Sequence, residues 1–198
     1  MLVLASTSRY RAELQRRLDV PFETAAPRFD EEAHRHRFEE LSPDAFALEL
    51  ARGKAESLRG DFPEAWILAA DQVGVLESAS GPRLLRKPGS VEAAVAQLMA
   101  MAGRAHELIN GIVLAPPGGG APQERVSRHR LFMRDFGESE ARAYVERYRP
   151  LDSAGAYRIE DAGIRLFERI EGDDFTGIMG LPLLGVAQML REASLLPG

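Results

Sequence analysis

The sequence has 198 residues, of which 45% are hydrophobic and 28% are charged, and its formal net charge is −5. These values are typical of one globular domain, or one domain with two lobes, and they do not favour a basic nucleic-acid-binding surface. The absence of cysteine excludes a disulfide framework, a thiolate zinc site and a cysteine nucleophile. The longest apolar stretch, 178–190, is interrupted by glycine, proline and glutamine, so we expect no membrane span. The start MLVLASTSRYR is unlike a secretory signal, and we expect a cytoplasmic protein.

Hydrophobic periodicity and capping residues predict alternating strands and helices along the chain. The predicted strands lie at 2–5, 22–26, 66–70, 107–114, 125–136, 156–159 and 164–170, with a hairpin formed by 73–76 and 84–85. The predicted helices lie at 9–18, 42–59, 90–101 and 138–148, and a last one begins at Leu181-Pro182. Residues 28–41 are predicted to be a polar loop. This order of elements indicates an α/β protein with a mixed sheet.

A first candidate site follows the first predicted strand, where Ser6, Thr7 and Ser8 precede Arg9, Tyr10 and Arg11. Hydroxyls, free backbone N–H groups and arginines at the start of a helix form an anion-binding site. A plain helix cap followed by a solvated basic turn explains the same residues.

A second candidate is Asp71-Gln72, which follows the apolar strand predicted at 66–70. A carboxylate at the end of a buried strand lies at the edge of an open α/β sheet, where it can bind Mg²⁺ or accept a proton from water. An aspartate that caps a turn is the alternative interpretation.

Acidic residues and lysines supply the remaining candidates. Glu31, in the cluster 30–32, could join Asp71 on one metal ion, although a solvated acidic loop is an equally simple explanation. We interpret the nearby His34 and His36 as surface residues. Lys54 and Lys87 are the only lysines among 25 basic residues, and both could reach phosphates as compact charges.

Several short motifs occur together in an informative order. They are Leu4-Ala5-Ser6-Thr7-Ser8 with Arg11, Asp30-Glu31, Ala51 to Ala55 around Lys54, Ala70-Asp71-Gln72-Val73, Lys87-Pro88, His106, Ala154-Gly155-Ala156-Tyr157, Glu171-Gly172-Asp173 and Gly180-Leu181-Pro182-Leu183. Together they resemble the Maf family of nucleoside triphosphate pyrophosphatases across nearly the whole chain.

Other residues resemble the branch of the family that acts on 7-methyl-GTP. They are Gln72 after the aspartate, the aromatic Tyr10, the acid Glu160, and the stretches 166–169 and 188–191. The chain differs from the family pattern at Arg9, where proline is usual, and at Tyr10, where this branch usually has tryptophan.

The resemblance implies a Maf/ITPase-like mixed twisted sheet in a single domain over 1–198, with two lobes around a central active-site cleft, often as a homodimer. It implies that Asp71 is catalytic and that Glu31 and Asp71 bind a divalent metal, namely Mg²⁺, Mn²⁺ or Co²⁺. The expected phosphate-binding residues are Ser6, Ser8, Arg11, Lys54 and Lys87.

The implied base site would use Tyr10, Gln72 and Glu160. Methylation at N7 gives guanine a delocalised positive charge, so a stacked aromatic ring gains a cation–π contribution of roughly 0.5–2 kcal/mol. Glu160 would accept hydrogen bonds from the guanine N1–H and 2-amino group, while Gln72 would supply an amide.

The resulting prediction is an enzyme that hydrolyses 7-methyl-GTP to 7-methyl-GMP and pyrophosphate, with no nucleic-acid or membrane partner. Two alternatives remain from the sequence. One is a Maf-type pyrophosphatase for UTP or dTTP, and the other is a regulator of cell division that binds nucleotides without turnover.

Overall fold

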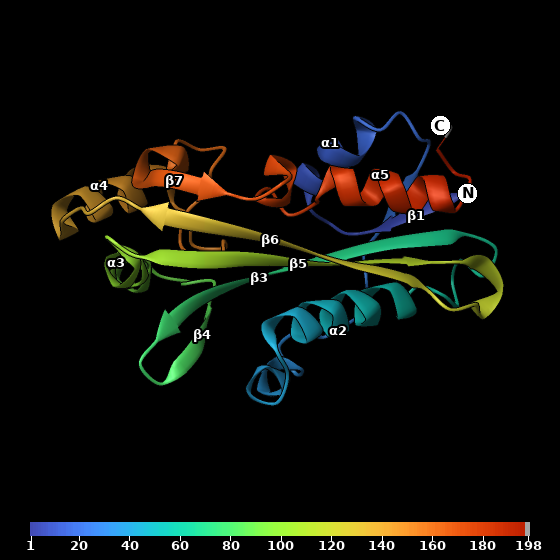
Figure 1. Ribbon diagram of the computed structural model, residues 1–198, viewed down its shortest axis with the longest axis horizontal. Coiled ribbons are helices and arrows are strands. Elements are labelled where there is room, and N and C mark those ends of the chain that lie inside the picture. The colour runs from blue at the N-terminus through green and yellow to red at the C-terminus, as the bar shows by residue number, and fades with distance from the viewer. Residues whose placement is uncertain (197–198) are drawn as a thin grey trace. The chain divides into compact units, whose positions relative to one another are not determined.

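The computed structural model describes residues 1–196 and confirms the α/β class, with a seven-stranded mixed sheet and five α-helices in this part of the chain (Figure 1). The strands are β1 (Leu2–Ala5), β2 (Glu23–Ala25), β3 (Trp66–Ser78), β4 (Gly81–Leu85), β5 (Ala105–Ala115), β6 (Gln123–Met133) and β7 (Phe167–Glu171). The helices are α1 (Arg9–Arg16), α2 (Pro43–Glu56), α3 (Val91–Met101), α4 (Glu138–Tyr148) and α5 (Leu183–Glu192). Within residues 1–196, no helix has both the length and the apolar composition needed to cross a membrane.

The sheet has the strand order β2-β1-β3-β5-β6-β7, with β4 paired to β3. The chain divides into two compact units. The first contains 1–72, 109–127 and the segment from Asp174 onward, and the second contains 73–108 and 128–173. The expected cleft between two lobes stays a prediction.

In the first unit, β1 pairs in parallel with both β2 and β3. The alternation of side chains along these strands builds two apolar layers. Leu68 and Ile112 face one way and pack with α1 and α5, whereas Ile67 and Val113 face the other way and pack with Ala51 of α2. Helix α2 therefore covers the opposite face of the strands from α1 and α5 (Figure 1).

A glycine allows α2 to lie unusually close to the sheet. A Cβ atom at Gly111 of β5 would stand 2.4 Å from the carbonyl oxygen of Ala47 and 2.5 Å from the backbone nitrogen of Leu48. Because real Cβ atoms do not approach backbone so closely, a larger residue at position 111 would force α2 away from β5.

Serine caps begin three of the helices, as local sequence chemistry predicts. The hydroxyl of Ser42 accepts from the backbone N–H of Ala45 at 3.3 Å, and Ser90 accepts from Ala93 at 3.2 Å. The third cap is Ser8, at the start of α1. The loop predicted at 28–41 contains one short 3₁₀ turn, Arg35–Glu39.

In the second unit, β4 pairs antiparallel with the second half of β3, and β7 pairs antiparallel with β6. Helices α3 and α4 pack against each other. The predicted hairpin is confirmed, but its first strand is continuous with the strand predicted at 66–70.

The strand predicted at 156–159 is wrong. Gly155 and Ala156 have positive φ values of 86° and 59°, which break an extended conformation, and the Tyr157 ring packs closely on Gly155. The strand predicted at 164–170 begins with a 3₁₀ turn, Gly163–Leu166, so that β7 starts only at Phe167.

Candidate functional site

The structure separates the predicted site residues between the two units. Eight lie in the first unit: Ser6, Ser8, Tyr10, Arg11, Glu31, Lys54, Asp71 and Gln72. Lys87 and Glu160 lie in the second unit, where both are exposed. Their assigned roles in binding phosphate and the base stay predictions.

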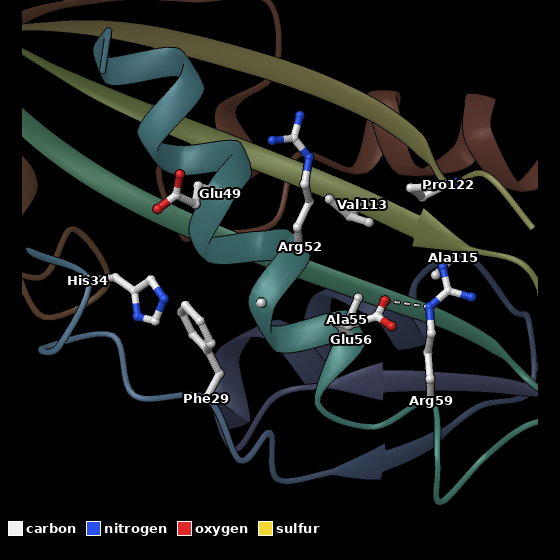
Figure 2. A pocket seen from close by; sticks show the side chains of 11 residues that line it. Phe29, His34, Glu49, Arg52, Ala55, Glu56, Arg59, Val113, Ala115 and Pro122 are labelled. Atoms are coloured by element: carbon white, nitrogen blue, oxygen red, sulfur yellow. Dashed lines mark hydrogen bonds and ion pairs between the residues drawn. The ribbon is translucent and has the colours of Figure 1, made fainter. Parts of the chain in front are cut away.

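A pocket of about 390 Å³ lies beside α2 in the first unit (Figure 2). Its lining includes Phe29, His34, Arg52 and Arg59, together with Val113 of β5. None of the predicted site residues lines it. Arg52 is paired with Glu124, and Arg59 is paired with Glu56. Two of the predicted residues, Glu31 and Asp71, instead contact the side chain of Lys54.

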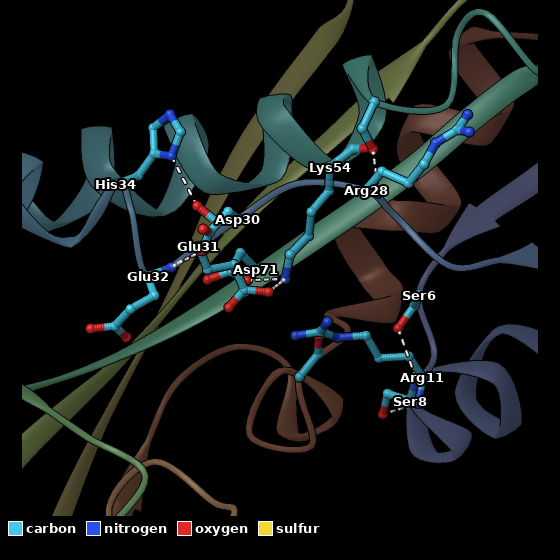
Figure 3. A network of polar contacts seen from close by, with 12 residues as sticks. Ser6, Ser8, Arg11, Arg28, Asp30, Glu31, Glu32, His34, Lys54 and Asp71 are labelled. Carbon is cyan, nitrogen blue, oxygen red and sulfur yellow. Dashed lines mark hydrogen bonds and ion pairs between the residues drawn. The ribbon is translucent and has the colours of Figure 1, made fainter.

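Lys54 is the centre of this charged cluster (Figure 3). It projects from α2, is only 5% exposed, and forms ion pairs with Asp71 and, at 2.8 Å, with Glu31 Oε1. Lys54 lies three residues after Ala51 and four before Leu58, and these two residues face the sheet. The helical repeat therefore turns the ammonium inward.

Asp71 meets Lys54 because of strand alternation. Residues 67, 69 and 71 of β3 point to the face that α2 covers. The sequence prediction that Asp71 ends its strand is wrong, since β3 continues to Ser78. It is the neighbouring strand that ends: β1 pairs Leu4 with Leu68 and stops at Ala5, so Asp71 lies beyond it.

Burial raises the pKa of the Asp71 carboxyl above its ordinary value. The charges of Lys54 and Arg11 act in the opposite direction, and the nearby Glu31 adds to the increase. The pKa is raised because desolvation disfavours the charged carboxylate more than the two cations favour it. A carboxylate with a raised pKa is a stronger base, which suits a group that takes a proton from water.

The turn between β1 and α1 is both a helix cap and a candidate anion site. The hydroxyl of Ser6 accepts from the backbone N–H of Ser8 at 3.1 Å, and the hydroxyl of Ser8 accepts from the N–H of Arg11 at 3.4 Å. The first turn of α1 contains no acidic residue, so no side-chain carboxylate offsets the positive end of the helix. The capping interpretation is confirmed, and it is compatible with anion binding.

Arg11 is held by one side of its guanidinium. Its Nε donates to the carbonyl oxygen of Gly180 at 2.8 Å, and its charge offsets part of the rise in the Asp71 pKa. The terminal nitrogens of Arg11 therefore lie within electrostatic reach of the catalytic candidate.

Glu31 reaches the cluster from a loop with its own local order. The Asp30 carboxylate accepts from the backbone N–H groups of Glu32 at 3.0 Å and Ala33 at 3.2 Å, so Asp30 forms a turn. The ring of Phe29 packs on Gly53, where an added Cβ would stand 2.2 Å from the ring. This contact ties the loop to α2 beside Lys54.

The carboxylates of Glu31 and Asp71 converge on one point, which the Lys54 ammonium contacts. No group of three or more His, Asp or Glu with metal-site geometry occurs within residues 1–196. Two carboxylates are sufficient for Mg²⁺ when water and substrate phosphates complete its shell. The donor set fits a cation that binds with a polyphosphate, and it does not form an all-protein cage.

Gln72 points to the other face of β3 and makes contacts that sequence reasoning missed. Its amide nitrogen donates to the carbonyl oxygens of Gly177 at 2.7 Å and Ile178 at 3.2 Å. Asn110 of β5 is fully buried and donates to the same Gly177 oxygen at 3.0 Å. The only sequence signal for Asn110 is a single amide within an apolar strand.

Tyr10 already packs against a cation. The guanidinium of Arg9 lies 4.8 Å from the centre of the Tyr10 ring and donates to its hydroxyl at 2.8 Å. A cationic base that stacked on the same ring face would have to displace Arg9.

Comparison with known proteins shows the family of the chain. The family model described as "Maf-like protein" matches residues 1–193. The chain belongs to the Maf family. A 7-methyl-GTP pyrophosphatase of Syntrophotalea carbinolica is 40% identical to it, over 96% of this chain and 93% of its own. A protein of the same name from Chromohalobacter salexigens is 40% identical, over 99% of this chain and 97% of its own. One from Pseudomonas aeruginosa is 38% identical, over 96% of this chain and 95% of its own.

Proposed function

We propose that this Maf protein hydrolyses 7-methyl-GTP to 7-methyl-GMP and pyrophosphate, and so removes a modified nucleotide from the cytoplasmic pool. The observation that carries the proposal is the full-length similarity to several proteins named 7-methyl-GTP pyrophosphatase. The buried cluster of Lys54, Asp71 and Glu31 supports a reaction at a polyanionic substrate.

In the proposed reaction, Asp71 orients a water molecule and takes its proton as the water oxygen attacks the α-phosphorus. The bond from the α-phosphorus to its bridging oxygen breaks, and pyrophosphate leaves. Lys54 and Arg11, together with the N–H groups at the start of α1, stabilise the negative charge on the leaving group. Lys87 adds a further cation in this proposal.

A divalent cation, namely Mg²⁺, Mn²⁺ or Co²⁺, belongs to the proposal. Glu31 and Asp71 would hold it, and the bound ion would neutralise charge on the phosphates. Because the Lys54 ammonium contacts both carboxylates, the ion would have to take over some of these contacts when it binds with the substrate phosphates.

For selection of the base, we retain Tyr10, Gln72 and Glu160 as specificity residues. Gln72 uses its amide nitrogen on the backbone of 177–178, which leaves its carbonyl oxygen to accept from a guanine edge. We also expect a homodimer and no nucleic-acid partner.

The test is a panel of 7-methyl-GTP, GTP, UTP, dTTP and CTP with Mg²⁺ or Mn²⁺, in which pyrophosphate and orthophosphate are followed separately. We expect pyrophosphate chiefly from 7-methyl-GTP, with loss of turnover in Asp71→Asn and no loss in the exposed control Asp135→Asn. Preference for UTP or dTTP would keep the reaction and overturn the base assignment. Nucleotide binding without turnover would favour the regulatory alternative.

A matched variant tests the base site separately. Glu160→Gln should lower kcat/KM for 7-methyl-GTP relative to GTP, because it replaces an acceptor carboxylate with a neutral amide. An unchanged ratio of the two kcat/KM values would remove Glu160 from this role.

A further inference from the structure

The segment between β7 and α5 is fixed at both of its ends by side-chain hydrogen bonds. Asp174 accepts from the backbone N–H of Thr176 at 3.0 Å and from that of Leu184 at 2.7 Å. The hydroxyl of Thr176 accepts from the N–H of Leu183 at 2.8 Å. These bonds close residues 175–180, called here the 175–180 loop, into a compact turn at the start of α5.

The middle of the 175–180 loop is held by two amides from the sheet. Asn110 and Gln72 both donate to the carbonyl oxygen of Gly177, at 3.0 Å and 2.7 Å, and Gln72 also donates to Asn110 Oδ1 at 3.3 Å. Burying an amide such as Asn110 is unfavourable unless it is hydrogen-bonded, and an apolar residue would fill the strand position without this cost. We therefore attribute the presence of this buried amide to its hydrogen bond with the 175–180 loop.

The end of the 175–180 loop contacts the phosphate-binding candidate Arg11. Gly180 has a φ of +94°, a conformation that side-chain-bearing residues rarely adopt, and its carbonyl oxygen accepts from Arg11 Nε at 2.8 Å. A Cβ atom at Gly180 would lie 3.4 Å from the same nitrogen. The position of this carbonyl decides the direction of the rigid guanidinium fork.

We propose that Asn110 is a positioning residue for Arg11: it holds Gly177, the 175–180 loop holds the Gly180 carbonyl oxygen, and this oxygen aims the terminal nitrogens of Arg11 at the substrate phosphates. The inference rests on the proposed function, because it takes Arg11 as a phosphate ligand. Gln72 shares the Gly177 oxygen, so loss of Asn110 alone loosens the loop without releasing it.

A double-mutant cycle tests the inference. The variants are Asn110→Leu, which has a similar volume, Arg11→Ala, and the two combined. Gln97→Ala is the matched control, since this amide bonds only the backbone of Arg86 among the described residues, at 3.1 and 2.8 Å. The readouts are kcat/KM for 7-methyl-GTP and the Kd for inorganic pyrophosphate with Mg²⁺ by calorimetry, which requires no turnover.

We expect Asn110→Leu to lower kcat/KM and pyrophosphate affinity by about 10- to 100-fold, because even a small misplacement of a phosphate ligand costs most of its contribution. In the Arg11→Ala background the same change should have less than about a twofold effect. Equal losses in both backgrounds would overturn the inference, since Asn110 would then act on the fold and not through Arg11.

If Asn110→Leu fails to fold, Gly180→Ala replaces it in the same cycle, with the same expected dependence on Arg11. If the protein hydrolyses no nucleotide, the proposed reaction fails, yet the pyrophosphate affinities still decide whether Asn110 acts through Arg11. Unchanged affinity for pyrophosphate in both variants, Asn110→Leu and Gly180→Ala, would also overturn the inference.

Discussion

Each unit buries a pair of ionisable side chains, and the two pairs differ in charge. In the first unit, Lys54 and Asp71 form an ion pair with exposures of about 5%. In the second unit, His106 Nε2 and the Tyr157 hydroxyl lie 2.7 Å apart in an aromatic cluster with Phe167. Burial lowers the pKa of His106 to about 4 and raises the pKa of Tyr157, so both are neutral at pH 7.

The difference in charge distinguishes a pair that suits a binding site from a pair that belongs to the core. In the neutral pair, His106 Nε2 and the Tyr157 hydroxyl satisfy each other and pack among aromatic rings, whereas His106 Nδ1 has no hydrogen-bond partner within residues 1–196. A buried ion pair carries a desolvation penalty that an apolar pair would avoid, so stability alone does not explain Lys54 and Asp71. The charged pair is instead suited to exchange its partners for a charged ligand, and the following predictions test this contrast.

The largest effect is expected for Asp71→Asn. This change removes the proton acceptor and leaves a similar shape, so kcat for pyrophosphate release should fall by about 10²- to 10⁴-fold. The melting temperature should also fall, because the buried Lys54 ammonium loses its main counter-charge and keeps only Glu31. Retention of more than about a tenth of the activity would exclude Asp71 as the base.

Lys54→Met should destabilise the protein by about 3–5 kcal/mol, because the buried Asp71 carboxylate loses its main cation. Urea unfolding at pH 7 measures the change. The exposed lysine supplies a matched control, Lys87→Met, for which a change within about 0.5 kcal/mol is expected. Adding Asp71→Asn to Lys54→Met should restore most of the loss, and no restoration would show that the two charges are not coupled.

The neutral pair should appear in the pH dependence of stability. Because the His106 pKa is lower in the folded state than its ordinary 6.5, the unfolded chain takes up the proton first. The contribution of neutral His106 to the free energy of unfolding is fully present above pH 6.5. It falls by about 3 kcal/mol as the pH decreases toward 4. His106→Gln should flatten this slope in urea titrations, whereas the exposed control His36→Gln should preserve it.

The smallest effect is expected at Glu31, the exposed partner of Lys54 in the charged cluster. Gly53→Ala would place a Cβ against the Phe29 ring and shift the loop that carries Glu31, so kcat/KM should fall by roughly tenfold. Gly60→Ala is the control, since nothing lies within 4 Å of its added Cβ. Equal activity of the two variants would show that the Phe29 contact does not position Glu31.

Local chemistry explains what the sequence could predict. The strand 2–5 and the helices capped by Ser42 and Ser90 follow from residues close in the chain, and the structure confirms them. Lys54 and Asp71 were also foreseen as candidates, although their direct contact depends on α2 crossing the face that odd-numbered residues of β3 present.

Long-range contacts explain what the sequence could not predict. The Arg11–Gly180 hydrogen bond joins residues 169 positions apart, and nothing in either segment alone predicts it. Asn110 was missed because one amide in an apolar strand has no local pattern. The false strand at 156–159 resulted from apolar residues whose backbone has positive φ at Ala156.

Gly111 sets the distance between α2 and the sheet, and the charged cluster around Lys54, two helical turns away, depends on this distance. A lysine side chain has a fixed maximum reach, and Lys54 spans the gap between α2 and β3 only because the backbone of Ala47 rests directly on Gly111. One added methyl group at position 111 would push α2 away from β5 and would move the Lys54 ammonium away from Asp71. The reach of the Lys54 ammonium thus depends on a carbon atom that the chain omits at Gly111.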